Sequence, residues 1–584
     1  MNANNWIKTN YGIVLILFLA ALLRFYHIDF QSIWLDEIHT MIEANPNATI
    51  PEVYNSITVS EQMPPLYFYS IYFLFKIFGY TTLVARVYSA VLGIISVFAL
   101  YKLGKELFSK QTGLIAAWFL CVNPFHLFYS QEARPYIFLL ITTIISFYAL
   151  VKFLKDPIRK KAIYFGIAAG AMLLSHFFGM FVLLSQGFIL LIFLLLSEKK
   201  NRMAFFINSA IGGLLSLLLF VPAFKILIKV SEIKEFWIPP TTIDTIKQIF
   251  KDFCGNSDFV LILSILGIVY FIVMQLRDQK TLKTYSDVVA NKQLLSSILL
   301  GSWIIIVLAV PIIRSYLTIP MIVSRYFIVI LPALILVVAI AVERVKNKII
   351  TLVFVALFSV GCLYEITLHS NYYNSISKAQ FREITQFVND NNQENDPVYT
   401  SLGWYFSYFF NNDEVKTSVT GTTLQDYINE VRKDSTQLKS FWAVESRHPY
   451  SVDESTQKHL DDKFIIDKSQ DYFDTWAKHY ILKTPQSLKE HKIPADGVVL
   501  SNITDENWAG GVGKNYNMFL LDYSAEKETK LKKAKKAKFK DGREVVVVGY
   551  EHIGAYLHIQ IQGSAFIYKD VASYPNAIEI ITNE

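Results

Sequence analysis

Residues 12–37 read GIVLILFLAALLRFYHIDFQSIWLDE, an apolar run followed within about a dozen residues by the adjacent carboxylates Asp36 and Glu37. Lys8 precedes the run, and no cleavage site of small residues follows it. The run is therefore predicted to be a retained membrane anchor rather than a signal peptide. An ionised carboxylate next to a membrane segment is costly unless it faces water or a partner, so both acids are candidate functional residues.

The composition extends this membrane prediction to most of the chain. Its 584 residues are 53% hydrophobic, 15% aromatic and only 18% charged, and the mean hydropathy is +0.34. Soluble proteins carry about a quarter charged residues, so a polytopic α-helical membrane protein is predicted. Three dispersed cysteines predict neither a disulfide framework nor a metal box. The net charge of +6 is too small for this length to indicate a nucleic-acid partner.

Ten further apolar runs follow the first one. They lie at residues 84–102, 112–129, 136–154, 162–175, 177–196, 204–227, 258–276, 293–313, 325–342 and 349–367. Lysine and arginine cluster in every second connecting loop. By the positive-inside rule, this alternation predicts about eleven transmembrane helices, with the N-terminus in the cytoplasm and the C-terminus outside.

One apolar segment, Pro65–Gly79, is left out of this count. It is about fifteen residues long, which is short for a crossing helix, and it follows Pro64. If it crossed, the basic loop 102–110 would lie outside and the alternation would break. We predict a juxtamembrane helix here, within a first outer loop that covers residues 26–82. Further outer loops are predicted at residues 130–136, 232–258 and 314–325, so polar chemistry is concentrated on the outer side.

The composition changes after the membrane domain, which is predicted to cover residues 1–368. About 215 residues follow without another apolar run and are expected to form a soluble extracytoplasmic region. Region 369–490 mixes amphipathic and short apolar pieces, as in a small α/β layer. Region 491–584 alternates with a period of two and predicts a β-rich module, with strands at 517–523, 544–550, 556–562 and 577–582. Seven lysines within residues 530–540 are expected to form a solvated hairpin or loop rather than a lipid-headgroup contact.

The first outer loop and the outer ends of three spans hold the candidate site. Asp36 and Glu37 could simply favour a following helix by lying at its N-terminus. Arg86, Arg134 and Arg325 each open an apolar run at its outer end, as does Glu132. A single arginine there could snorkel to lipid headgroups. Three arginines that converge on one face would instead bind a phosphate through paired hydrogen bonds.

A carboxylate base beside a phosphate socket at a membrane surface indicates one reaction class. The prenyl tail of a lipid-linked phosphosugar would lie against the spans, and its phosphate on the arginines. Asp36 would remove a proton from an acceptor hydroxyl or amine, which attacks the anomeric carbon on the side opposite the phosphate. This is general-base catalysis with electrostatic stabilisation of the leaving group, and it requires no nucleotide-sugar site.

Short motifs with a fixed order relative to the spans identify a family resemblance. They are Trp34-Leu35-Asp36-Glu37, Pro64-Pro65-Leu66-Tyr67, Arg86, Asn123-Pro124, Ser130-Gln131-Glu132-Ala133-Arg134-Pro135-Tyr136 and Ser324-Arg325-Tyr326. Together they resemble the bacterial membrane glycosyltransferases of the protein O-mannosyltransferase and aminoarabinose transferase type, a family-39-like group with the GT-C fold. The resemblance covers roughly residues 10–370.

The resemblance implies a polyprenyl- or dolichyl-phosphate sugar donor and inversion at the anomeric carbon. It implies that Asp36 is the catalytic carboxylate of the first outer loop. The donor-site and supporting residues implied in the same way are Glu37, Arg86, Glu132, Arg134, Arg325, Tyr67 and Tyr136. The expected partners are this donor, an acceptor that is a lipid, a glycan or a protein, and membrane lipids.

One position departs from the family pattern. Histidine often precedes the Pro-Pro pair in this family, but Met63 stands here, and nearby His39 is the candidate substitute. His126 and His176 lie near outer span ends, but no ligand set has metal-binding spacing, so no metal or other cofactor is expected. Trp508, in a glycine-rich loop of the C-terminal module, could stack on a sugar or simply pack in a core.

Two other classes of protein are compatible with many membrane spans and basic residues. A transporter or flippase for lipid-linked glycans, or a glycan polymerase, would more often place charged or broken-helix sites near the bilayer midplane, with related repeats. No repeat is visible here, and the acids and arginines lie at outer span ends, which favours the enzyme. A receptor anchored by an inactive membrane part is the non-enzymatic alternative. A bacterial inner membrane fits the short loops and the family resemblance.

Overall fold

The computed structural model describes residues 3–233, 238–277, 284–412, 417–433, 438–448, 450–484, 486–487, 516–522, 525–533, 536–539, 544–553, 556–562 and 578–581. The chain divides into two compact units. The membrane unit consists of Met1–Phe30 and His39–Ser375, and the C-terminal unit of Gln31–Ile38 and Ile376–Glu584. The segment that carries Asp36 and Glu37 therefore belongs to the C-terminal unit, although it lies early in the sequence.

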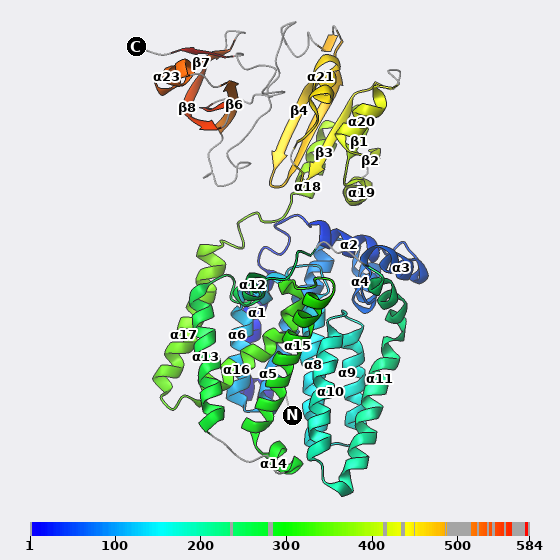
Figure 1. The fold of residues 1–584 in the computed structure, drawn as a ribbon, viewed down its shortest axis with the longest axis vertical. Helices are drawn as coiled ribbons and strands as arrows, with labels where there is room; N and C mark the ends of the chain where they lie inside the picture. The colour runs from blue at the N-terminus through cyan, green and yellow to red at the C-terminus, as the bar shows by residue number, and fades with distance from the viewer. Residues whose placement is uncertain are drawn as a thin grey trace. The chain divides into compact units, whose positions relative to one another are not determined.

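Long apolar helices make up most of the membrane unit (Figure 1). They are α1 (Ala3–Phe25), α5 (Thr82–Leu107), α6 (Lys110–Val122), α7 (Pro124–Ser130), α8 (Tyr136–Lys155), α9 (Arg159–Leu173), α10 (Gly179–Leu196), α11 (Lys199–Ser231), α13 (Asp258–Arg277), α15 (Lys292–Leu317), η2 (Ser324–Ile330), α16 (Leu331–Arg344), α17 (Lys348–Tyr364) and η3 (Glu365–His369). Each of the eleven predicted apolar runs coincides with one or more of these helices. In Figure 1, α8 to α11 run side by side, and α13 lies next to α17.

The number of candidate membrane spans, counted by the length and composition of the helices, is lower than the eleven predicted. Among the described residues, eight helices are long and apolar enough to cross a membrane. A ninth is counted if α6 and α7, bent by 65° at Asn123-Pro124, form one span. The apolar part of α1, Asn10–Phe25, and the 15-residue helix α9 are shorter. The polytopic membrane protein is confirmed, whereas the count of eleven is not.

Two helices form the centre of the membrane unit. In η2–α16 and in α8, respectively 83% and 72% of the span residues are buried, against 28–44% in the other spans. Because these two helices are apolar on nearly every side, they are enclosed by the other helices rather than by lipid. Trp303 of α15 stacks on Phe147 of α8, with ring centroids 3.6 Å apart. The residues at the N-terminal ends of η2 and α8 are consequently held by a close-packed core.

Short helices flank the long ones. They are α2 (Leu35–Glu43), α3 (Ile50–Ser56), η1 (Ile57–Glu61), α4 (Leu66–Phe78), α12 (Ile243–Phe253) and α14 (Tyr285–Ala290). Helix α4 is the segment predicted to be juxtamembrane. Its 13 residues are too few for a crossing, which needs about 20 residues. Pro65 caps its N-terminus, where a missing backbone N–H costs nothing.

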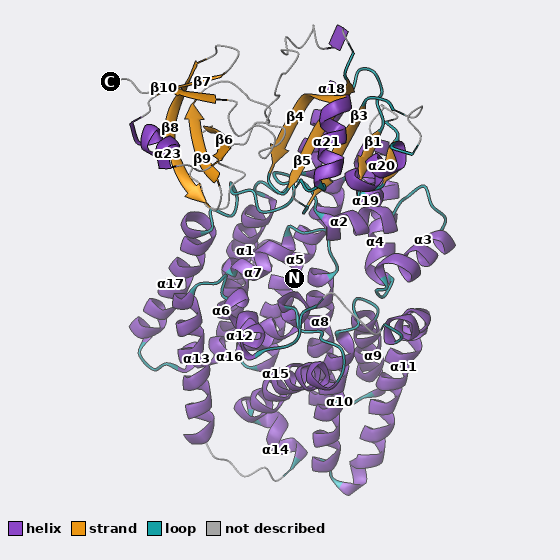
Figure 2. Ribbon diagram, turned by 45° about the horizontal axis from the view of Figure 1, so that its top comes forward, coloured by secondary structure: helices purple, strands orange, loops and turns teal. Residues whose placement is uncertain are grey.

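The C-terminal unit contains a mixed five-stranded sheet with the order β2-β1-β3-β5-β4 (Figure 2). Its elements are α18 (Phe381–Asn391), β1 (Val398–Thr400), α19 (Gly403–Asn412), β2 (Val419–Gly421), α20 (Leu424–Val431), β3 (Phe441–Ser446), α21 (Glu454–Lys463), β4 (Phe464–Tyr472) and β5 (Thr475–Leu482). Strands β2, β1 and β3 are parallel, and β5 and β4 are antiparallel to their neighbours. Neighbouring strand residues point to opposite faces. Phe441 packs with Tyr427 of α20, and Trp442 with Phe387 of α18, so helices cover both faces.

A second sheet lies later in the chain and is antiparallel, with the order β10-β7-β8-β9-β6. Its strands are β6 (Tyr516–Asp522), β7 (Lys536–Phe539), β8 (Glu544–Ile553), β9 (Tyr556–Gln562) and β10 (Ile578–Ile581), and α23 (Ala525–Lys533) accompanies them. All four strands predicted from the period-two pattern are present. The region 530–540, predicted to be a solvated hairpin or loop, includes the end of α23 and all of β7, which pairs with β8. The domain boundary near residue 490 stays a prediction, and Trp508 lies outside the described residues.

Candidate active site

Arg134 is held by a buried carboxylate that the sequence did not single out. Arg134 precedes α8, and its Nη2 lies 2.5 Å from Oε1 of Glu61, the last residue of η1. The two side chains are 4% and 5% exposed. Glu61 Oε2 also lies 3.3 Å from Nδ1 of His39. A charge-assisted pair with so little solvent access fixes the direction of the guanidinium group.

Arg325 and Arg134 both lie close to the aromatic ring of Tyr136. The guanidinium carbon of Arg134 lies 5.9 Å from the ring centroid of Tyr136, and that of Arg325 lies 5.7 Å from the same centroid. Arg325 also lies 5.8 Å from the ring of Tyr326. Two of the three predicted arginines and Tyr136 are thus brought together by the N-terminal ends of the two central helices. Two guanidinium groups and the carboxylate of Glu61 thus lie together at the N-terminal ends of the two central helices.

His176 lies beside these arginines as a neutral imidazole. It occupies the turn between α9 and α10, with its ring centroid 5.0 Å from that of Tyr326. Burial, reinforced by Arg134 and Arg325, lowers the pKa of His176 to about 3. Nδ1 accepts a hydrogen bond from the backbone N–H of Phe178 at 3.1 Å, so the ring proton resides on Nε2. Nε2 is buried and has no hydrogen-bond partner among the described residues.

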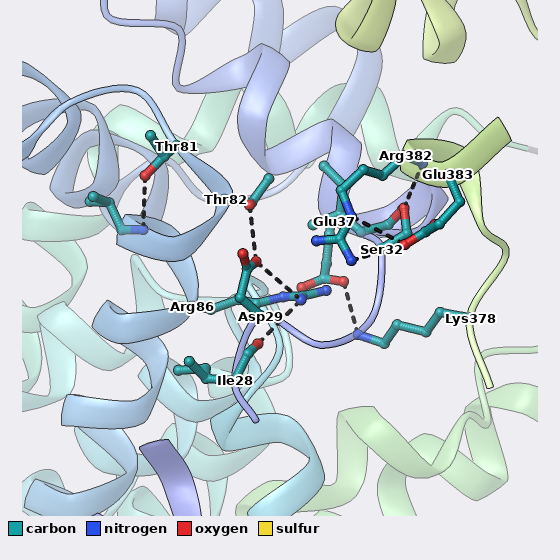
Figure 3. A network of polar contacts seen from close by, with 12 residues as sticks. Ile28, Asp29, Ser32, Glu37, Thr81, Thr82, Arg86, Lys378, Arg382 and Glu383 are labelled. Atoms are coloured by element: carbon teal, nitrogen blue, oxygen red, sulfur yellow. Dashed lines mark hydrogen bonds and ion pairs between the residues drawn. The ribbon is translucent and has the colours of Figure 1, made fainter. Parts of the chain in front are cut away.

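Arg86, the third predicted arginine, is held in the first turn of α5 (Figure 3). Its Nη1 donates to the carbonyl of Ile28 at 3.2 Å and lies 3.9 Å from Oδ1 of Asp29. Thr82 donates to the same carboxylate at 3.3 Å. The side chain of Arg86 is 2% exposed, so it does not snorkel to headgroups. These contacts show that it joins α5 to the loop after α1.

Two further predicted residues are buried in the membrane unit. Glu132 is 1% exposed, and its carbonyl accepts a hydrogen bond from the backbone N–H of Arg134 at 2.8 Å. Tyr67 is fully buried, with ring centroids 6.0 Å from Phe138 of α8 and 6.2 Å from Tyr88 of α5. Tyr67 therefore packs α4 against both helices.

A buried arginine supports the loop that carries Arg134. Arg24 is fully buried, and its guanidinium donates to the carbonyls of Leu120 and Cys121 at 3.2–3.3 Å. These carbonyls end α6 without helical partners because the chain turns into α7 at Pro124. Arg24 Nη2 lies 2.6 Å from Nδ1 of His126.

The same region ties the motif of residues 130–136 to its surroundings. Gln131 Nε2 donates to the carbonyls of Arg24 and Tyr26 at 3.0 and 2.8 Å. Tyr372 donates to Gln131 Oε1 at 2.8 Å. The polar residues of the motif are thus set by interior contacts, and the N-terminal end of α8 is positioned with them.

Asp36 and Glu37 occupy the first turn of α2 in the C-terminal unit. Acids that merely stabilise the N-terminus of a helix would lie in the same first turn, so this position alone does not distinguish the two roles. Glu37, however, is fully buried, and Lys378 Nζ lies 2.8 Å from its Oε2 (Figure 3). A solvated capping acid needs no such partner, so a simple capping role does not explain Glu37. A joint site of Asp36 with the arginines of the membrane unit stays a prediction.

An apolar cavity of about 430 Å³ lies between α6, α12, α13, α16 and α17. Phe119, Ile265 and Leu334 are among its lining residues, and Lys247 and Lys251 of α12 line it as well. Both lysines are at least 45% exposed and are paired with aspartates. The volume falls within the range of about 300–1,000 Å³ that is typical of ligand pockets.

Aromatic rings connect the cavity to the arginines. Phe253, which lines the cavity, lies 5.0 Å from Phe125, which lies 4.8 Å from Tyr129. Tyr129 lies 5.3 Å from Tyr136, all distances being between ring centroids. The apolar cavity and the group formed by Arg134, Arg325 and Tyr136 are therefore parts of one packed region. Within the described residues, no three His, Cys, Asp or Glu side chains are arranged to hold a metal ion.

Comparisons with known proteins agree with the resemblance seen in the sequence. Residues 62–225 match the dolichyl-phosphate-mannose-protein mannosyltransferase family. The structure is similar to ArnT from Cupriavidus metallidurans bound to undecaprenyl phosphate, with a TM-score of 0.52, 13% identity, and coverage of 82% of this chain and 98% of that chain. The apo state of ArnT gives a TM-score of 0.51, with 13% identity and the same two coverages.

A weaker likeness is found to the oligosaccharyltransferase AglB from Archaeoglobus fulgidus, with a TM-score of 0.48, 10% identity, and coverage of 91% of this chain and 81% of that chain. No curated protein matches the chain significantly by sequence. The fold is that of the GT-C membrane glycosyltransferases, and the predicted resemblance to this family is confirmed.

Proposed function

We propose that this protein transfers a sugar from a polyprenyl-phosphate-linked donor to an acceptor at the outer face of the cytoplasmic membrane. The single observation that carries the proposal is the pair Arg134 and Arg325 around Tyr136, at the ends of the two most buried helices. Planar guanidinium groups bind phosphate oxygens in pairs and do not lose their charge. His176 adds a neutral N–H donor beside them.

The apolar cavity supports a lipid-linked donor rather than a free sugar phosphate. A prenyl chain fits this cavity because the lining presents almost only hydrocarbon.

The proposed reaction is an inverting displacement. Asp36 accepts the proton of an acceptor hydroxyl or amine, and the acceptor atom forms a bond to the anomeric carbon. The bond between that carbon and the phosphate oxygen breaks, and its electron pair stays on the polyprenyl phosphate. Arg134 and Arg325 stabilise the added negative charge as it develops. Arg86 and Glu132 are assigned to the donor site, as the family resemblance implies, and Glu37 to the support of Asp36.

The transferred group is a hexosyl or pentosyl residue, and the acceptor is a lipid, a glycan or a protein. In the proposed orientation, the N-terminus is cytoplasmic and the C-terminal unit extracytoplasmic, in a bacterial inner membrane. This orientation follows from the basic loops, which alternate along the sequence. A reporter fused after Gly79 that scored cytoplasmic would contradict it.

The decisive experiment uses purified full-length protein and radiolabelled polyprenyl-phosphate sugars. We expect label to appear in an acceptor fraction, with release of polyprenyl phosphate. Asp36→Asn should lower kcat by about 100- to 10,000-fold, as loss of a general base does, with the donor Kd little changed. Unchanged activity in Asp36→Asn would remove the base assignment. Movement of the donor across a liposome bilayer without sugar transfer would instead indicate a flippase.

A further inference from the structure

Residues 376–382, at the start of the C-terminal region, form hydrogen bonds with residues 31–38, the segment that carries Asp36 and Glu37. Gln31 Oε1 accepts hydrogen bonds from the backbone N–H groups of Ser377 and Lys378 at 2.9 and 3.1 Å. Ser32 Oγ accepts from the backbone N–H of Arg382 at 3.0 Å. Residues 31–38 and 376–382 belong to the same compact unit. More than three hundred residues of chain separate these partners, so the contact is a tertiary one.

The strongest contact between the two segments is a buried ion pair (Figure 3). Lys378 Nζ lies 2.8 Å from Glu37 Oε2, with side-chain exposures of 11% and 0%. A buried carboxylate keeps its charge only when a partner offsets the loss of water. Lys378 supplies that partner from a stretch of sequence that no motif of the family resemblance includes.

We propose that Lys378 is a positioning residue for the Asp36–Glu37 pair, so that the C-terminal region is a working part of the transferase rather than an appendage. This inference rests on the proposed function. Asp36 and Glu37 share the first turn of α2, so a force on the Glu37 carboxylate acts on the backbone of Asp36. Lys378 binds the Glu37 carboxylate and sets the position of this turn through it. Lys378 itself does not touch the substrate.

A purely structural lysine is the competing explanation. It predicts that loss of Lys378 lowers the amount of folded protein and leaves the kinetics of the surviving fraction unchanged. The positioning role predicts altered kinetics in folded protein, because a displacement of about 1 Å at a reacting group costs on the order of 100-fold in rate.

The test compares Lys378→Met with Lys378→Arg in full-length protein. Lys468→Met is the matched control, since Lys468 in β4 donates to Asn391 at 2.9 Å and belongs to the same unit. We expect Lys378→Met to lower kcat on the order of 100-fold with the donor KM within about twofold of wild type. Lys378→Arg should retain most activity, and Lys468→Met should behave as wild type.

A double variant keeps the test valid if Lys378→Met folds poorly. Glu37→Gln with Lys378→Met removes both buried charges, so its thermal stability should return toward wild type while kcat stays low. A wild-type kcat in Lys378→Met would overturn the positioning role while the proposed function stands. Equal losses in Lys378→Arg and Lys378→Met would overturn it as well. Absence of any sugar transfer by the wild-type protein would overturn the proposed function and this inference together.

Discussion

His176 is the residue whose replacement tests the donor site most directly. We expect its Nε2–H, which has no hydrogen-bond partner among the described residues, to donate to an oxygen of the donor phosphate. His176→Phe keeps a buried ring and removes the donor group, whereas the side-chain amide of His176→Gln can restore an N–H near the position of Nε2. Arg134 and Arg325 remain in place in both variants.

The size of the effect follows from the charge of the ligand. A hydrogen bond to a charged group contributes about 1.5–3 kcal/mol, and about 1.4 kcal/mol corresponds to a tenfold change in affinity. His176→Phe should therefore weaken donor binding by about 10- to 150-fold, and His176→Gln should recover most of the loss. Binding of a labelled polyprenyl-phosphate sugar to detergent-solubilised protein measures both values. An unchanged Kd in His176→Phe, with a wild-type melting temperature, would refute the assignment.

The pH dependence supplies a second check on His176. Because its pKa is about 3 in the folded protein, the imidazole stays neutral between pH 5 and 8. Its titration should leave no step in donor affinity over that range. In the unfolded chain its pKa is near 6.5, so acid favours unfolding: stability from this residue is present above pH 6.5 and is lost as the pH falls toward 3. Thermal melts of His176→Phe should lose part of this acid sensitivity.

Three further predictions concern the surrounding structure. Arg325→Ala should weaken donor binding by at least tenfold, and Arg325→Lys should recover only part of it because lysine lacks the planar fork; an unchanged Kd would remove Arg325 from the site. Arg24→Met should lower the free energy of unfolding by about 2 to 6 kcal/mol, since the carbonyls of Leu120 and Cys121 lose their donors, and a wild-type melting temperature would contradict this. Ile265→Trp should narrow the apolar cavity and weaken the preference for long-chain over short-chain donors, whereas an unchanged preference would place the prenyl tail elsewhere.

The sequence predicted those site residues that lie at an unusual position relative to the apolar runs. Arg134 and Arg325 stand out because a charge at the end of an apolar run is unusual. Glu61 gave no comparable signal, since it is one polar residue among others before Met63. Only the fold shows that Glu61 fixes Arg134 and that Lys378 meets Glu37. Such pairs join distant segments, and no local pattern encodes them.

By itself, the sequence determined which part of the chain lies in the membrane, through its apolar runs. It also determined the strands of the last region, through their period of two, and the short helix at Leu66–Phe78. These features depend on local hydrophobicity and periodicity, which a sequence states directly. The tertiary structure decided which runs are central, where Pro124 bends α6 into α7, and which charges are buried with which partners. The acid pair shows the difference: its position after the first span was readable, but its place in the C-terminal unit depends on contacts across more than three hundred residues.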